Sequence, residues 1–273
     1  MQPILIDQAP YTYKQAYSPF ALTDLLIDNA DRKQQSFLHF WQLEHTMILG
    51  MKDTRVEDLP AGVAHLVQAD YPPVVRNSGG LGVIADSGIL NISLVLPNPD
   101  KKWTTDQAYE QMLAFTKKAL PELSIEAYEV SDSYCPGKYD FSVNGQKIAG
   151  TAQRRIKDGV AVMMYLSVNG DQIQRGKVVR EFYRQSLPTT FGTNGYPPVR
   201  PESMTTVAAC LDQNITVEEM KQRFLDALEI TDAPLDSQKW IKNEDLSAIY
   251  IEKLNRMIQR NQVIKELIDD DTL

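Results

Sequence analysis

The pattern of apolar and polar residues over the first two hundred positions predicts a mixture of helices and strands. Apolar residues at helical spacing predict helices that begin at Ser18-Pro19 and at Pro60, and two more over 104–119 and 171–186. Short apolar stretches bounded by turn residues predict strands at 37–41, 46–50, 74–76, 81–85, 89–96, 124–130, 139–143, 147–156 and 159–168. Asn144-Gly145 is typical of a two-residue turn, so it predicts a hairpin at that point.

From about residue 201 the pattern is that of helices only. Thr216 followed by Glu219 fits a capping box, and apolar residues at helical spacing predict one long helix over 244–267. We therefore expect a mixed domain over 1–200 and a small helical subdomain over 201–273 packed on it. The three aspartates at 269–271 are expected to form a solvated end.

Composition and charge exclude several classes of protein. The net charge of −8 over 273 residues leaves no excess of basic residues for a nucleic-acid surface. No apolar run approaches the roughly 18–20 residues that span a bilayer, so we expect no membrane partner. Two cysteines 75 positions apart make no disulfide framework, and with no signal-peptide pattern this predicts a reducing cytoplasm. The three histidines show no ligand spacing, so no metal site is expected.

Cys135 is the first candidate for chemistry, because Ser133, Tyr134, Pro136 and Gly137 around it predict a polar turn rather than an apolar strand. A free cysteine is often a small buried hydrophobe, and we interpret Cys210 as such a residue in a helix. A thiolate, by contrast, is a nucleophile, and a nearby ammonium favours it. Lys147 follows twelve residues later, but pairing across the predicted hairpin places it opposite Ser142. The two side chains meet only if the Pro136-Gly137 turn folds the cysteine back.

Two further segments have the composition of a ligand site. The loop Arg76 to Gly80 contains Ser78, Gly79 and Gly80, and glycines let a ligand approach the backbone closely, although most such pairs are simply turns. Asp86 lies beyond it, and strand alternation points Asn91 and Ser93 to one face, where a buried polar pair needs partners. On the later strand, Gly150 and Ala152 leave room beside the backbone for a substrate.

These segments together resemble the lipoate-protein ligase and octanoyltransferase superfamily. The resemblance lies in Arg-x-Ser-Gly-Gly…Asp-x-Gly-x-x-Asn-x-Ser (76–93) and in the more specific Gly-Lys-Tyr-Asp-Phe-Ser…Gly-Gln-Lys-Ile-Ala-Gly-x-Ala-Gln-Arg-Arg (137–155). It covers roughly residues 20–200 and implies an α+β fold. The sheet would be mostly antiparallel and flanked by helices, as in biotin/lipoate protein ligases and class II synthetase catalytic domains.

Two departures narrow the activity that the resemblance implies. Leu81 stands where the ATP-using ligases have a third glycine, and Ala85 stands where they have a histidine before Asp86. With Cys135, this points to cysteine-dependent acyl transfer, most similar to octanoyl-[H protein]:protein amidotransferases. The rival donor is octanoyl-acyl carrier protein. Two less similar activities stay open, an ATP-dependent lipoate ligase and a non-catalytic carrier-binding module of the same fold.

The same resemblance assigns roles and partners. Cys135 would form an octanoyl thioester, and Lys147 would stabilise the thiolate and the acyl carbonyl. Arg76, Ser78, Gly79, Gly80, Asp86, Gly150 and Ala152 would line the substrate site. The donor would be the octanoylated H protein of glycine cleavage, and the acceptors would be lipoyl domains of 2-oxoacid dehydrogenase complexes. No cofactor is implied. Since the chain is acidic overall, we expect carrier recognition to depend on local contacts of Arg76, Arg154 and Arg155.

Overall fold

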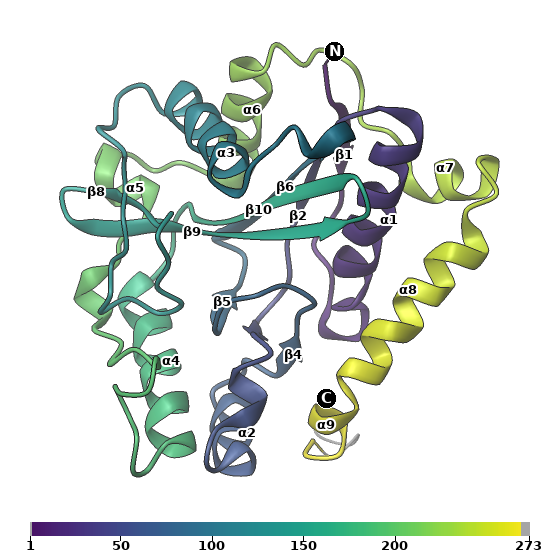
Figure 1. Cartoon of the computed structure of the whole chain (residues 1–273). Helices are drawn as coiled ribbons and strands as arrows, with labels where there is room; N and C mark the ends of the chain where they lie inside the picture. The colour runs from purple at the N-terminus through teal and green to yellow at the C-terminus, as the bar shows by residue number, and fades with distance from the viewer. Residues whose placement is uncertain (1, 269–273) are drawn as a thin grey trace.

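A mixed sheet of seven strands forms the centre of the molecule in the computed structural model, which describes residues 2–268 (Figure 1). The strand order is β1-β2-β6-β10-β9-β8-β7, and every neighbouring pair is antiparallel except β1 and β2. The strands are β1 (Ile4–Asp7), β2 (Phe37–Trp41), β6 (Ile89–Pro97), β7 (Glu126–Ala127), β8 (Phe141–Val143), β9 (Gln146–Ile156) and β10 (Gly159–Ser167). The mostly antiparallel α+β fold that the resemblance implied is confirmed.

A second, three-stranded sheet lies below the large one in Figure 1. It supports the loop Arg76 to Gly80, called the glycine loop below. Its order is β4-β3-β5, built from β3 (Thr46–Leu49), β4 (Pro73–Val75) and β5 (Val83–Ala85). Helices α2 (Leu59–Gln68) and α4 (Gln172–Ser186) pack beside it. Their buried side chains share one hydrophobic cluster with this sheet and with Trp41 and Tyr165 of the large one.

The other helices cover the opposite face and one side of the large sheet. Helices α3 (Thr105–Ala119) and α6 (Val217–Ala227) lie above the sheet in Figure 1 and close the second hydrophobic cluster. Helix α1 (Ser18–Lys33) packs against β6 and β10 and also against α8 (Ser247–Arg260), in the third cluster. The short helices α5 (Val207–Leu211), α7 (Ser237–Asn243) and α9 (Gln262–Lys265) complete the chain.

Local signals predicted one turn and one helix cap correctly. Thr216 and Glu219 form the predicted capping box, and Asn144 and Gly145 have φ of 50° and 83°, as a primed hairpin turn requires. The sequence predicts Ser18 as the N-cap of the first helix and Pro19 as its first residue, which is wrong, because Ser18 is already the first residue of α1 and Tyr17 precedes it without a side-chain cap.

Two predicted elements were wrong in length because tertiary contacts end them. The strand expected over 124–130 is only Glu126–Ala127, since the Val130 N–H is bound by the Asp140 carboxylate. The helix expected over 244–267 is interrupted at Asn261. The side-chain oxygen of Asn261 accepts from Val75 N–H at 2.6 Å, and its nitrogen donates to Val75 O at 3.0 Å.

The segment from α5 to α9 contributes buried residues to all three clusters, which it shares with elements before residue 200. The boundary at about residue 200 stays a prediction, and the aspartates at 269–271 lie outside the described residues. Between residues 2 and 268, no helix has the length and apolar character needed to cross a membrane.

Candidate active site

Strand pairing sets a row of residues across the large sheet, on the face turned toward the small one. Asn91 of β6 pairs with Tyr165 of β10, and Tyr165 pairs with Gly150 of β9. Two residues further along each strand, Met163 pairs with Ala152. Alternate residues of a strand share a face, so this register brings residues of distant segments to one patch of the sheet. This patch is called the floor of the site below.

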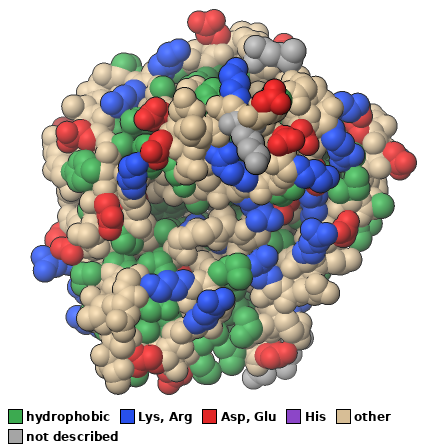
Figure 2. All heavy atoms as spheres, in the orientation of Figure 1, with side chains coloured by type: hydrophobic (Ala, Val, Ile, Leu, Met, Phe, Trp, Pro, Cys, Tyr) green, Lys and Arg blue, Asp and Glu red, His purple; other side chains and the backbone are tan. Residues whose placement is uncertain are grey.

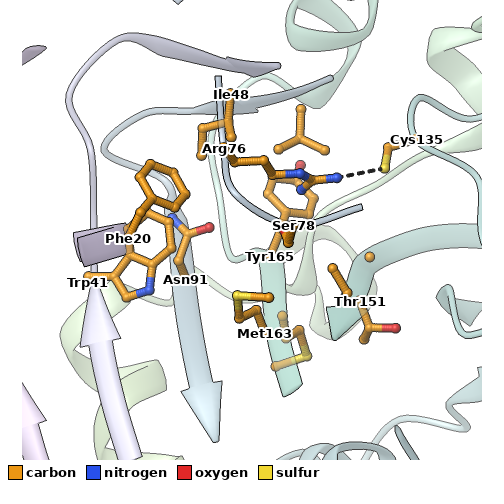
Figure 3. A pocket seen from close by; sticks show the side chains of 14 residues that line it. Phe20, Trp41, Ile48, Arg76, Ser78, Asn91, Cys135, Thr151, Met163 and Tyr165 are labelled. Carbon is orange, nitrogen blue, oxygen red and sulfur yellow. Dashed lines mark hydrogen bonds between the residues drawn. The ribbon is translucent and has the colours of Figure 1, made fainter. Parts of the chain in front are cut away.

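A predominantly apolar pocket lies on this floor, with a volume of about 480 Å³ including its open mouth. Figure 3 shows Phe20, Trp41 and Asn91 on one side of it, with Arg76 and Cys135 on the other. The full lining is Phe20, Trp41, Ile48, Arg76, Ser78, Val83, Asn91, Cys135, Gly150, Thr151, Ala152, Met163, Met164 and Tyr165. Apolar walls of this kind bury a hydrocarbon chain, while a few polar groups fix its orientation.

Cys135 reaches this pocket from the loop between β7 and β8, in a left-handed backbone conformation with φ of 47°. The preceding residue, Tyr134, holds this loop in place through buried contacts. Tyr134 is fully buried, its hydroxyl contacts that of Tyr165, and it accepts a hydrogen bond from Gln172 Nε2 at 2.9 Å. A left-handed conformation is unfavourable for a residue with a side chain, so the surrounding contacts must hold it.

The sulfur of Cys135 lies against the glycine loop, where it accepts two hydrogen bonds. Leu81 N–H donates at 3.1 Å and Arg76 Nη2 at 3.5 Å, the second drawn as a dashed line in Figure 3. Gly80 has φ of 97°, and a Cβ there would lie 2.3 Å from Arg76 Nη2 and 3.0 Å from the sulfur. The glycine is therefore required for the guanidinium and the thiol to meet.

Lys147 is buried beside the same loop and holds its backbone. Its ammonium donates to Tyr134 O at 2.9 Å, to Cys135 O at 2.8 Å and to Ser133 Oγ at 3.2 Å, and it pairs with Asp140 at 2.9 Å. Every hydrogen bond that it makes to the described residues thus ends on an oxygen. The cation in hydrogen-bond contact with the sulfur is Arg76.

Asp140 completes the clamp on the loop. Its second carboxylate oxygen accepts from the N–H groups of Val130 and Gly137, at 3.2 and 3.1 Å. Burial raises the pKa of Asp140, while the attraction of Lys147 and these hydrogen bonds act in the opposite direction. The Lys147–Asp140 pair therefore fastens the cysteine loop at four backbone groups.

The structure brings most of the predicted site residues together. Ser78, Gly150 and Ala152 line the pocket with Arg76 and Cys135, and a Cβ on Gly150 would press on the Lys147 side chain at 3.3 Å. Gly79 faces open space, since a Cβ there would meet nothing within 4 Å.

Asp86 lies away from the pocket lining. It forms a buried ion pair with Arg175, with Arg175 Nε 2.7 Å from Oδ2, and its other oxygen accepts from Gly88 N–H at 2.9 Å. These contacts fasten the turn between β5 and β6. Arg154 is likewise occupied, by an ion pair with Asp24 and a bond to Asn77 O.

Several pocket residues were missed by sequence reasoning. Phe20, Trp41 and Met163 look like ordinary core residues in an apolar pattern, and the Leu81 N–H has no sequence signal at all. Asn91 did have a sequence signal, because a polar residue inside an apolar strand needs hydrogen-bond partners. It is buried, and its side-chain nitrogen has no partner among residues 2–268. That donor is available to a bound group.

A buried network supports the glycine loop from behind. Tyr183 accepts a hydrogen bond from Gly82 N–H at 3.2 Å and donates to Asp53 at 2.9 Å, and Asp53 also accepts from Gly50 N–H at 2.8 Å. Burial raises the pKa of Asp53 to about 6, although these bonds and the charge of Arg76 oppose the shift.

Asp53→Asn should flatten the pH dependence of stability between about pH 4 and pH 6. The folded-state pKa of Asp53 lies above its ordinary value, so the folded protein binds this proton more tightly than the unfolded chain does. The resulting stability is present below pH 4 and is lost as pH rises through 6, on the order of 2–3 kcal/mol. Urea unfolding across this range measures it. Asp232→Asn, on an exposed loop, should follow the wild type, and an unchanged slope in Asp53→Asn would contradict the assignment.

No metal site accompanies these groups: across residues 2–268, no three His, Cys, Asp or Glu side chains gather in a way that could hold a metal ion. Cys210 lies on α5, partly buried, as predicted for a helix residue packed against the core. Burial raises the pKa of Cys210, which disfavours its thiolate.

Solved structures support the fold assignment. A lipoate-protein ligase A bound with ATP superposes with a TM-score of 0.70 at 15% identity, covering 97% of this chain and 99% of that one. A chain from the structure of a bi-partite lipoate protein ligase and its E2 lipoyl domain from Thermoplasma acidophilum gives a TM-score of 0.66 at 16% identity, with both chains covered completely.

Curated relatives match over most of the sequence. The octanoyl-[GcvH]:protein N-octanoyltransferases of Anoxybacillus flavithermus and Exiguobacterium sibiricum are 36% and 38% identical, each over 91% of this chain and 90% of its own length. The lipoyl-[GcvH]:protein N-lipoyltransferase of Listeria monocytogenes is 36% identical over the same shares. The family model for the lipoyl protein ligase A/B catalytic domain matches residues 15–229. The resemblance carried by the two sequence blocks is therefore confirmed, and the chain belongs to the lipoyl protein ligase A/B catalytic domain family.

Proposed function

We propose that this chain is an octanoyl-[GcvH]:protein N-octanoyltransferase, which moves an octanoyl group from the H protein of glycine cleavage to a lysine of other lipoyl domains. The names of its relatives at 34–38% identity support the donor and the acyl group. The acceptors, lipoyl domains of 2-oxoacid dehydrogenase complexes, follow from the family resemblance. We expect the reaction in the cytoplasm, where the thiol of Cys135 stays reduced.

The observation that carries the proposal is a thiol at the wall of an apolar pocket, facing two hydrogen-bond donors. Cys135 Sγ borders the cavity, and the Leu81 N–H and Arg76 guanidinium both point to it. A charged donor and a backbone N–H can stabilise the negative charge that the sulfur carries as it attacks and as it leaves. The neighbouring hydrocarbon walls suit an octanoyl chain.

Transfer would proceed in two displacements. The Cys135 thiolate attacks the carbonyl carbon of the octanoyl-lysine amide on the donor. The C–N bond breaks, the donor nitrogen takes up one proton from the solvent and leaves as the lysine amine, and an octanoyl thioester forms on the enzyme. The neutral amine of the acceptor lysine then attacks the thioester, the C–S bond breaks, and the thiolate returns as the acceptor amine gives up its proton. Since one amide replaces another, no ATP is consumed.

The side chains around the sulfur would divide the work. Arg76 and Leu81 N–H stabilise the thiolate, both when it attacks and when it leaves. Lys147 and Asp140 hold the loop, so that the sulfur faces the pocket with its backbone already ordered. Near-attack positioning of this kind is a large part of catalysis by covalent enzymes. Lys147 is therefore proposed as a positioning residue, with its ammonium on the carbonyls of Tyr134 and Cys135.

A panel of acyl donors tests this function. The chain is mixed with an apo lipoyl domain and one of octanoyl-GcvH, lipoyl-GcvH, octanoyl-acyl carrier protein, or octanoate with ATP. We expect octanoyl transfer from octanoyl-GcvH without ATP, measured as the mass increase of the lipoyl domain. The lipoyl-GcvH arm is included because a relative at 36% identity is named a lipoyltransferase. Transfer only from acyl carrier protein, or only with ATP, would replace the proposal by one of its rivals.

Replacing Arg76 by Gln should slow alkylation of Cys135 by iodoacetamide about tenfold at neutral pH. A hydrogen bond from a charged donor contributes about 1.5–3 kcal/mol, and its loss removes stabilisation from the attacking sulfur. The rate is measured in a Cys210→Ala background, so that one thiol reacts. Arg155→Gln, which changes an exposed arginine, is the matched control and should keep the parent rate. Equal rates in all three proteins would remove Arg76 from the role of thiolate partner.

A further inference from the structure

A second hollow, here called the basic groove, lies where α1, the end of β9 and α8 meet. Six of its lining side chains are cationic and three are acidic. Figure 2 shows Lys and Arg side chains gathering on this side of the molecule. The groove is lined by Asp24, Asp28, Arg32, Arg154, Arg155, Ile156, Lys157, Ile249, Glu252, Lys253 and Arg256.

Internal ion pairs use only part of this positive charge. Lys253 is buried against Asp28, Arg154 pairs with Asp24, and Arg256 pairs with Glu252. The remaining cations are Arg32, Arg155 and Lys157, all exposed. Lys157 makes only a long ion pair, 3.9 Å from its Nζ to Asp28 Oδ1, and Lys253 already pairs with that carboxylate. On a chain of net charge −8, a groove with this excess of positive charge is an exception.

The groove shares a wall with the acyl pocket. Arg154 lines the groove and donates from Nη1 to Asn77 O at 2.7 Å, and the next residue, Ser78, lines the pocket. Strand β9 connects the two sites as well, because Ala152 borders the pocket and Arg154 and Arg155 border the groove. Beyond residue 149 this strand pairs with β10 alone among the described strands.

We infer that the basic groove docks the acyl carrier domain through a carboxylate-rich face beside its modified lysine. The inference rests on the proposed function, because only a protein-borne acyl group needs a docking surface next to the pocket. Positive charge there would concentrate and orient an acidic partner, which raises the rate of productive encounter. The acyl-lysine arm would then reach Cys135 past Ser78 and the glycine loop.

This assignment changes which arginines recognise the carrier. Arg76 is 9% exposed and holds Cys135, and Arg154 holds Asp24 and Asn77. Neither is free for a partner, whereas Arg155 and Lys157 are exposed at the end of β9 and in the turn that follows. Arg155 donates to Trp103 O at 3.0 Å and to Gln153 Oε1 at 3.1 Å, two neutral acceptors that leave its charge unpaired. Recognition therefore falls on a neighbouring pair of cations, one of which sequence reasoning had not selected.

The test compares Arg155→Glu/Lys157→Glu with Lys117→Glu/Lys177→Glu, a double variant with the same change of charge on exposed positions of α3 and α4. Two acyl donors are used, octanoyl-GcvH and the small thioester octanoyl-N-acetylcysteamine. The readout is the rate of acyl-enzyme formation on Cys135, at low and at physiological ionic strength. We expect the groove variant to lose about tenfold in rate with octanoyl-GcvH at low ionic strength, with a weaker salt dependence. Its rate with the small thioester should be unchanged.

Equal rates with octanoyl-GcvH in the groove variant and the charge control would overturn the docking inference while leaving the proposed function intact. A wild-type protein that is acylated by the small thioester but never by octanoyl-GcvH would overturn the proposed function, and the docking inference with it. If the groove variant also slows with the small thioester, Arg155→Gln/Lys157→Gln is measured in its place. An equal loss with both donors in that milder variant would show a structural role and contradict docking.

Discussion

Cys135→Ala is expected to abolish octanoyl transfer, with a loss of at least about 10³-fold, the scale on which removal of a covalent nucleophile acts. The sulfur contributes the bond that forms in the first displacement, and no other described side chain lines the pocket as a nucleophile of this kind. The fold should be retained, because the residue is only partly buried at the edge of the core. Single-turnover transfer and thermal unfolding measure the two effects.

Cys210→Ala is the matched control, since it removes the other thiol from a helix outside the pocket. It should transfer octanoate at the wild-type rate. Substantial turnover in Cys135→Ala, or loss of turnover in Cys210→Ala, would show that the nucleophile is assigned to the wrong residue.

Lys147→Met should lose both stability and acylation. Removing one member of a buried ion pair leaves the other charge unpaired, which costs about 3–5 kcal/mol. The Tyr134 and Cys135 carbonyls would also lose their donor, so the loop would no longer hold the sulfur in its left-handed conformation. Urea unfolding gives the first quantity, and the rate of acylation by a small octanoyl thioester gives the second.

Lys221→Met is the control that distinguishes a loss of folding stability from a loss of acylation rate. Lys221 is also buried and pairs with Asp7 and Glu218, on α6 at the opposite face of the sheet. Its replacement should lower stability while acylation continues at the wild-type rate. If Lys147→Met is destabilised but acylates normally, Lys147 is a structural residue without a part in positioning the thiol.

The alkylation experiment on Arg76 decides a second question about Lys147. From the sequence, Lys147 is the expected cation for the thiolate, because the family resemblance implies that role for it. In the structure the sulfur accepts from Arg76 and Leu81, which lie 59 and 54 residues away along the chain. We therefore expect Arg76→Gln to slow alkylation more than Lys147→Met does at equal pH.

Features that depend on residues close together in the chain were predictable from the sequence, and features that depend on residues far apart were not. The hairpin at Asn144-Gly145 and the capping box at Thr216 depend on neighbouring residues, so local patterns identify them. The partner of Asp86 is Arg175, 89 residues later, and nothing in the local pattern reveals that this acidic residue fastens the turn between β5 and β6. The break at Asn261 has the same origin, since its side chain binds Val75, 186 residues earlier.

The residues of the candidate site also fall into a predictable and an unpredictable group. Cys135, Lys147 and the glycine loop were predictable because unusual residue types stand at unusual places. The apolar wall was not, because Phe20, Trp41 and Met163 have the pattern of core residues, and only the register of β2, β6 and β10 brings two of them to one floor. Sequence reasoning therefore selected the polar groups of the candidate site more readily than the apolar wall of its pocket.

The most direct measurement of the central claim is the intact mass of the protein after mixing with octanoyl-GcvH in the absence of ATP. The account predicts one octanoyl adduct that hydroxylamine removes, that is absent in Cys135→Ala, and that disappears on addition of an apo lipoyl domain as octanoate appears on the domain's lysine. A wild-type protein that transfers octanoate to the domain while Cys135 never carries the adduct, or that forms the adduct only when ATP is present, would contradict it.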